Sequence, residues 1–158
     1  MKVRVLSKDH FDTVLPRMRI DNSNVEQQLN YAFISITDGD MEDVHYFEKD
    51  YRNVLNLEFD DATDEENERR VKFGQSELLL FTVEQAKRVI EFIEKNKNVE
   101  TLFVHCLAGR SRSGAVGLFI NDIYGEQTYF EFANSNPTIN PNYYIVALLR
   151  RVQNERIN

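Results

Sequence analysis

The segment that most constrains the fold is a short apolar run, T-L-F-V-H-C, at residues 101–106. It lacks the alternation of a strand with one solvent-exposed face, so it indicates a β-strand buried on both sides. Such a strand needs helices on both faces of its sheet. Apolar residues at helical spacing flank it at residues 82–98 and 113–124. The sequence therefore predicts an α/β fold with a small, largely parallel central sheet flanked by helices.

Other segments are also expected to be strands. Residues 2–6 and 54–59 alternate apolar and polar side chains, and residues 31–37 form a second buried run. Residues 7–30 are mixed in character and contain Pro16, which favours short helical pieces and loop.

The clearest helix covers residues 82–98. Thr82, followed three residues later by Gln85, has the spacing of a capping box. The apolar residues of this segment recur at helical spacing, which predicts a core-facing stripe. The stripe consists of Ala86, Val89, Ile90 and Ile93.

Further helices are expected at residues 113–124, 126–134 and 142–154, with Gly125 as a stop signal. Residues 60–72 are the most polar part of the chain, which is typical of a solvated loop or an exposed helix face. A turn is expected at 38–40, where Asp-Gly-Asp follows a strand. In the helix after the apolar run, the residues expected to face inward are Val116, Phe119, Ile120 and Ile123.

Length, charge and cysteine count exclude several classes of protein. A length of 158 residues fits one domain. The net charge of −7 argues against a general nucleic-acid binder and against an anionic membrane surface. The chain shows neither an apolar run that could cross a bilayer nor the apolar segment of a secretory signal. One cysteine excludes an internal disulfide and favours a reducing compartment, so a cytoplasmic location is expected.

The loop after the central strand carries the chemistry. Ligands of open α/β sheets bind at the carboxyl ends of the strands, where Cys106 is placed. The backbone N–H groups of a short strand-to-helix loop can converge on one anion, and Gly109 allows the necessary backbone angles. Arg112 offers a planar fork for two phosphate oxygens. The same donors favour the Cys106 thiolate, which indicates phosphoryl transfer to sulfur. A buried structural cysteine near a surface arginine is the plainer alternative, and the placement between strand and helix disfavours it.

The segment H-C-L-A-G-R-S-R-S resembles the signature of cysteine-dependent protein phosphatases, closest to the dual-specificity branch. The resemblance covers residues 31–150. It implies that Cys106 is the nucleophile, that Arg112 binds phosphate, that Ser113 assists the departing thiolate and that His105 tunes the cysteine. The backbone donors it implies are Leu107, Ala108, Gly109, Arg110 and Ser111.

Two weaker similarities accompany the signature. Residues 139–142, I-N-P-N, resemble the I-x-P-N stretch before the last helix of the family. Low-molecular-weight phosphatases also use Cys-x5-Arg, but near the N-terminus, so a cysteine at position 106 argues against them.

A general acid is needed to protonate the leaving group, and the same carboxyl group can later activate water. The F-D-D segment at residues 59–61 is similar to that of the regenerating-liver phosphatases, in which the second aspartate acts. This resemblance favours Asp61, with Asp60 and Asp64 as alternatives. Neighbouring side chains of an extended strand point to opposite sides, so only one of the adjacent carboxylates should face the pocket. A simple strand-end turn is the competing interpretation.

We therefore expect residues 1–158 to form a single phosphatase domain acting on a phosphorylated protein or peptide through a phosphocysteine. Phosphate analogues such as vanadate should inhibit it. No cofactor is expected, and three scattered histidines suggest no metal site. One alternative is the same chemistry on an RNA 5′-triphosphate or a phosphoinositide, for which Arg110 could meet a second negative group. Another alternative is a non-hydrolysing module that binds phosphorylated residues. The Arg-Ser pair after the loop disfavours a third alternative, rhodanese-like sulfur transfer. The sequence leaves open whether phosphotyrosine or phosphoserine/phosphothreonine is preferred, and it leaves the oligomeric state open.

Overall fold

A computed structural model describes residues 1–39 and 44–158. Within these residues, four strands form one sheet in the order β1-β4-β2-β3, and every neighbouring pair is parallel. The strands are β1 (Lys2–Ser7), β2 (Tyr31–Thr37), β3 (Val54–Glu58) and β4 (Thr101–Cys106). The predicted parallel sheet is confirmed, and β4, which carries the cysteine, is one of its two central strands.

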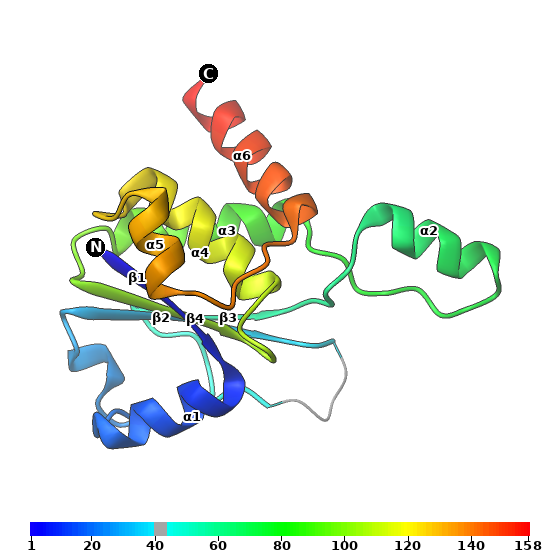
Figure 1. Ribbon diagram of the computed structural model, residues 1–158. Helices are drawn as coiled ribbons and strands as arrows, with labels where there is room; N and C mark the ends of the chain where they lie inside the picture. Colours follow the sequence, from blue (N-terminus) through cyan, green and yellow to red (C-terminus); the bar gives the residue numbers. More distant parts are fainter. Residues whose placement is uncertain (40–43) are drawn as a thin grey trace.

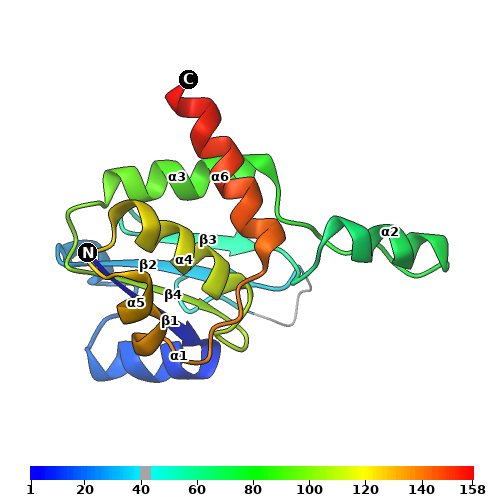
Figure 2. The same cartoon turned by 45° about the horizontal axis from the view of Figure 1, so that its top comes forward.

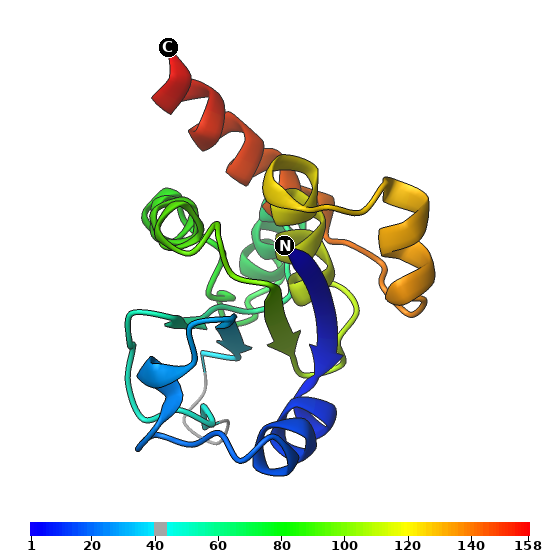
Figure 3. The same cartoon turned by 90° about the vertical axis from the view of Figure 1, so that its left-hand side faces the viewer.

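Helices cover both faces of the sheet. In Figure 1, α1 lies below the sheet, whereas α3, α4 and α6 lie above it. Figure 3, which views the molecule from the side, shows the same two layers. The helices are α1 (Lys8–Arg17), the 3-10 turn η1 (Val25–Gln27), α2 (Asp64–Lys72), α3 (Val83–Lys95), α4 (Arg112–Tyr124), α5 (Tyr129–Ser135) and α6 (Tyr143–Ile157).

Strand β4 is buried on both faces, as its apolar run predicts. Leu102, Val104 and Cys106 belong to the larger core, which lies under α3, α4 and α6. Phe103 points the other way and packs with Phe33 in the smaller core beside α1. The alternation of side chains along a strand divides these residues between two apolar layers, so the sequence shows no polar face.

Helix α3 begins as the capping box predicts. The Gln85 backbone N–H donates to Thr82 Oγ1 at 3.1 Å, and the Thr82 backbone N–H donates to Gln85 Oε1 at 3.1 Å. The predicted stripe of the helix is buried. The helix ends at Lys95, a few residues before the predicted boundary.

Two sequence-based expectations, at Pro16 and Ile123, differ from the structure, and a third falls outside the described residues. The chain stays helical through Pro16 instead of breaking before it; Pro16 lies in the last turn of α1, where the helix ends one residue later at Arg17. Ile123, expected to face inward, is 38% exposed, because it lies in the last turn of α4 beside a groove shared with Arg150. Asp40, from the turn expected at residues 38–40, lies outside the described residues.

Helix α2 differs from the other helices. It has no buried residue and projects away from the sheet and its covering layers (Figures 1 and 2). The expectation of an exposed polar segment at residues 60–72 is confirmed for most of its length, although Ala62 is buried. Among the described residues, no helix is long and apolar enough to span a membrane.

Candidate active site

The loop from β4 to α4 forms one side of a cleft of about 410 Å³ at the carboxyl edge of the sheet. This is the edge at which open parallel sheets bind their ligands. The structure thus brings together residues from three distant segments of the chain. The cleft is lined by Asp61, Cys106, Leu107, Ala108, Arg110, Ser111, Arg112 and Asn140.

The end of β1 supports this loop from below. Gly109 has φ of 68°, a conformation that favours glycine. A Cβ atom at this position would lie 2.5 Å from the Ser7 backbone nitrogen and 2.6 Å from the Leu6 carbonyl carbon. The Lys8 backbone N–H donates to the Leu107 carbonyl at 3.1 Å. Only glycine therefore allows the loop to rest directly on the N-terminal strand.

Cys106 lies at the base of the cleft and is buried. Its Sγ is 3.1 Å from Ser113 Oγ. Burial alone would raise the pKa of the Cys106 thiol. Hydrogen bonds from the Ser113 side chain and from the backbone of Ser113 and Arg110, together with the charge of Arg112, outweigh burial and lower the pKa. The site therefore favours the thiolate, which is the nucleophilic form.

Arg112 is buried and is held by the ends of two neighbouring strands. Its Nη1 donates to Asp38 Oδ1, just after β2, at 2.5 Å, and to the Phe59 carbonyl, just after β3, at 2.9 Å. Sequence analysis placed Asp38 only in a turn. The available signal was its position, since the carboxyl ends of parallel strands meet at one edge of the sheet. These two contacts fix the plane of the guanidinium group.

Asp61 lies across the cleft from the loop. Its Oδ1 accepts hydrogen bonds from Ser111 Oγ at 2.8 Å and from Asn142 Nδ2 at 3.0 Å. One partner belongs to the loop itself and the other to the start of α6. The carboxyl group is therefore oriented by two elements that are far from it in sequence.

Asp60 and Asp64 are placed differently from Asp61. The Asp60 carboxylate accepts from the backbone N–H groups of Leu79, at 2.7 Å, and Gly39, at 3.4 Å. Asp64 is the first residue of α2 and lines another groove. Of these three aspartates, Asp61 alone lines the cleft that contains Cys106.

Asn142 is a site residue that sequence analysis did not assign. Its Oδ1 accepts from the Tyr144 backbone N–H at 3.0 Å and so caps α6. Its Nδ2 donates to Asp61 Oδ1 and to the Ala62 carbonyl, the latter at 3.1 Å. The I-N-P-N stretch was the signal that could have identified it. The Asn142 side chain thus links the start of α6 to Asp61 in the cleft.

His105 lies behind the loop and is fully buried. Burial is the main reason that its pKa falls to about 4, so the ring is neutral near pH 7. A neutral imidazole has one donor nitrogen and one acceptor nitrogen. His105 Nδ1 lies 3.2 Å from the Cys106 carbonyl, which can only accept, so Nδ1 carries the proton and Nε2 is the acceptor.

This tautomer sets the direction of a buried hydrogen-bond chain. Ser35 Oγ, 2.7 Å from His105 Nε2, must donate its single proton to that nitrogen. The same Oγ therefore accepts from His45 Nδ1, also at 2.7 Å. Neither Ser35 nor His45 was singled out from the sequence, because 70 residues separate Ser35 from His105. The chain connects the rear of the loop to the far side of β2.

The outer rim of the cleft is cationic. Arg110 lines the cleft and is exposed, so it meets solvent rather than the buried base. Together with Arg112 and the N-terminus of α4, it gives the cleft the character of an anion site. In the part of the chain that the structure describes, no group of three or more His, Cys, Asp or Glu residues is arranged to hold a metal ion.

Comparison with known proteins supports the architecture. No family model matches the sequence, and no curated protein sequence matches it. A solved structure of a PTP-2 phosphatase from Cydia pomonella is similar with a TM-score of 0.58 and 12% identity, covering 96% of this chain and 85% of that chain. A human tyrosine phosphatase-like serine/threonine/tyrosine-interacting protein is similar with a TM-score of 0.50 and 18% identity, covering 96% and 87%. The chain therefore has the fold of the protein tyrosine and dual-specificity phosphatases, as the loop signature indicated.

Proposed function

We propose that the protein is a phosphomonoester hydrolase of the tyrosine or dual-specificity phosphatase type. The observation that carries this proposal is the convergence of Cys106, Arg112 and Asp61 on one cleft. These groups supply a nucleophile of lowered pKa, a phosphate ligand and a proton donor, which are the parts that phosphate ester hydrolysis requires. The shared fold supports the same assignment.

Substrate binding is assigned to the loop and to Arg112. The backbone N–H groups of residues 107–111 and the N-terminus of α4 would hold the nonbridging phosphate oxygens. Asp38 and Phe59 already hold Nη1 of Arg112, so the other guanidinium donors are those we assign to phosphate. Donors fixed in advance stabilise the charge that develops on these oxygens in the transition state.

The first step forms the S–P bond and breaks the P–O bond of the ester. The Cys106 thiolate attacks phosphorus in line with the leaving oxygen. Asp61, in its protonated form, gives its proton to that oxygen as the bond breaks. The products of this step are a free alcohol or phenol and a phosphocysteine.

The second step returns the enzyme to its starting state. Asp61, now ionised, takes a proton from water while the water oxygen bonds to phosphorus and the S–P bond breaks. Ser113, 3.1 Å from Sγ, donates to the departing thiolate. Inorganic phosphate is released, and Asp61 is again protonated.

Hydrolysis of a small aryl phosphate across pH, without added metal, tests the mechanism. We expect a bell-shaped profile with the native protein and loss of turnover in Cys106→Ser. That variant should still bind vanadate or phosphate, because the loop amides and Arg112 remain. Turnover that persists in Cys106→Ser would overturn the mechanism.

Substrate class is tested by comparing kcat/KM for a phosphopeptide, a phosphoinositide and an RNA 5′-triphosphate. We propose the phosphopeptide as the preferred substrate. A preference for either polyanion that is lost in Arg110→Ala would instead assign the cationic rim to a second phosphate. The second candidate function is phospho-residue recognition without turnover, favoured by the phosphatase-like interacting protein among the similar structures. Tight phosphopeptide binding with no hydrolysis by the native protein would select it.

A further inference from the structure

The carbonyl groups of the β4–α4 loop decide where its amide groups point. In a trans peptide the C=O and the N–H point in opposite directions, so a carbonyl held behind the loop turns the next N–H toward the cleft. The Leu107 carbonyl is held in this way by the Lys8 backbone N–H, 3.1 Å away beneath the loop. The N–H of Ala108, which lines the cleft, is therefore directed into it.

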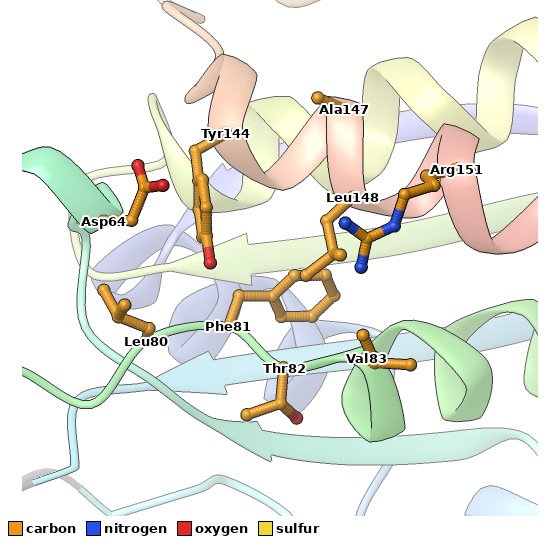
Figure 4. A pocket seen from close by; sticks show the side chains of 9 residues that line it. All are labelled: Asp64, Leu80, Phe81, Thr82, Val83, Tyr144, Ala147, Leu148 and Arg151. Carbon is orange, nitrogen blue, oxygen red and sulfur yellow. The ribbon is translucent and has the colours of Figure 1, made fainter.

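Two more loop carbonyls are held by the segment that leads into α6. The Arg110 carbonyl accepts from the Asn140 backbone N–H at 2.9 Å, and the Ser111 carbonyl accepts from the Asn142 backbone N–H at 3.0 Å. Helix α6 fixes the end of this segment, and its Tyr144 lines a separate groove (Figure 4). These carbonyls are thus positioned by the backbone of a neighbouring element.

The Cys106 carbonyl is held by a side chain instead. His105 Nδ1 donates to it at 3.2 Å, behind the loop. The peptide between Cys106 and Leu107 therefore directs its N–H to the opposite side, which is the cleft. This orientation depends on the tautomer of His105, because a bare Nδ1 would place its lone pair against the carbonyl oxygen.

The surroundings of His105 leave its tautomer to one hydroxyl group. The ring packs on Phe11 with 4.2 Å between the ring centres, and both His105 and Ser35 are fully buried. The charged groups of α1 that act on the ring are Lys8 and Asp12, which pair with each other at 2.8 Å. Ser35 Oγ lies 2.7 Å from Nε2, so its proton makes this nitrogen the acceptor and leaves the ring proton on Nδ1.

His45 settles the role of that hydroxyl. A serine hydroxyl can donate to an imidazole nitrogen or accept from it. With His45 Nδ1 donating to Ser35 Oγ at 2.7 Å, the serine proton is left for His105. On its other side, His45 Nε2 lies 3.3 Å from Thr37 Oγ1 and 3.8 Å from Glu58 Oε1. Nδ1 is a donor whether the His45 ring is neutral or charged.

We propose that Ser35 and His45 are positioning residues of the active site, which act on Cys106 through His105. They hold the Cys106 carbonyl behind the loop, direct the Leu107 N–H at the phosphate and keep the negative end of the carbonyl away from the thiolate. The chain breaks no covalent bond and transfers no proton. The proposal rests on the proposed function, in which Cys106 is the nucleophile, but its test reads the thiol and needs no turnover.

Nitrogen-15 NMR of the native chain tests the direction of the hydrogen bonds. The sequence has three histidines, so their ring signals can be assigned by single substitutions. Near pH 7 we expect His105 to show a protonated Nδ1 and a bare Nε2. The opposite tautomer in the native protein would overturn the proposal without any variant.

Alkylation of the thiol tests the effect on Cys106. The sequence has one cysteine, so the rate of modification by iodoacetamide across pH reports on this thiol alone. In Ser35→Ala the midpoint of the rate profile should move to higher pH. Protection by vanadate should become about 10-fold weaker, the lower end of what one hydrogen bond to a charged group contributes. His45→Leu should shift both readouts in the same direction but less, because Ser35 can still donate.

Two matched variants separate positioning from packing. His45→Asn keeps an amide nitrogen in the place of Nδ1 and should restore native behaviour. Thr37→Val removes a hydroxyl from the same face of β2 but leaves the Nδ1 side intact, so it should also behave like the native protein. Thermal midpoints check that each variant is folded.

Native alkylation and vanadate protection in Ser35→Ala would overturn the proposal. A His45→Asn variant as impaired as His45→Leu would overturn the role of His45. Failure of the proposed function looks different, because a native protein that hydrolyses no phosphate ester would leave the tautomer and the thiol profile to be measured as before.

Discussion

At the scale of single residues, Ser113 is the side chain in direct contact with the reactive sulfur. A hydrogen bond to a charged group contributes about 1.5–3 kcal/mol, so Ser113→Ala should slow breakdown of the phosphocysteine about 10- to 100-fold. Rapid-mixing kinetics with an aryl phosphate should then show a burst of phenol release. Ser111→Ala is the matched control, because it removes a hydroxyl that contacts Asp61 instead of Cys106. Slower turnover of Ser113→Ala without a burst would contradict the assigned role.

The two adjacent aspartates can be separated by leaving-group dependence. Asp61→Asn removes the proton donor and should slow hydrolysis of alkyl phosphates by about 10²–10⁴-fold. An ester with a good leaving group needs no proton and should be affected much less. Asp60→Asn, whose side chain faces Leu79 rather than the cleft, should leave the leaving-group dependence unchanged. The opposite pattern would move the acid to Asp60.

At the scale of secondary-structure elements, Asn142 performs two tasks that substitution can separate. Asn142→Ala removes both the cap of α6 and the donor to Asp61, so it should lower stability by about 1 kcal/mol and also reduce activity. Asn142→Asp retains a capping oxygen but replaces the donor to Asp61 by a like charge. The basic limb of the kcat/KM profile should then move to higher pH while the thermal midpoint is preserved. An unmoved limb would show that Asn142 acts on α6 alone.

Local patterns were sufficient to identify the four strands and the helices α3, α4, α5 and α6. The capping box of Thr82 and Gln85 and the doubly buried run of β4 depend on neighbours in sequence, and both are confirmed. Pro16 shows the limit of this approach, because a proline is tolerated or excluded according to which helical turn it occupies. Sequence alone did not define the end of that helix.

The contacts of the site were less accessible from sequence, because they join distant segments. Asp38 meets Arg112 across 74 residues, and Asn142 meets Asp61 across 81. Each is an ordinary turn or capping residue in its local context. The loop itself could be identified because its residues occupy nine consecutive positions, 105–113. The groups that support it come from the ends of β1, β2 and β3 and from the start of α6.

At the scale of the whole molecule, His105 makes stability depend on pH. Its pKa is about 4 in the folded protein and about 6.5 when unfolded, so the unfolded chain binds more protons between these values. Stability should therefore fall as the pH drops from about 6.5 to about 4, by about 3 kcal/mol in total. Denaturant unfolding across this range should show a shallower dependence in His105→Asn. His10→Asn, at an exposed position, is the control, and an equal slope in His105→Asn would assign the effect to other groups.

The strand order β1-β4-β2-β3 also determines the sequence of events during synthesis. β1 leaves the ribosome before β2, β3 and β4, yet within the described residues its neighbour in the sheet is β4, whose register joins Lys2 to Thr101. The growing chain must therefore keep β1 unpaired until residues 101–106 have been made. Such non-local pairing is slow and leaves strand edges exposed to aggregation. Because β4 carries Cys106 and joins the two halves of the sheet, no nascent chain that ends before β4 can hold an assembled site, and nascent copies are expected to need a chaperone most before residue 106 emerges.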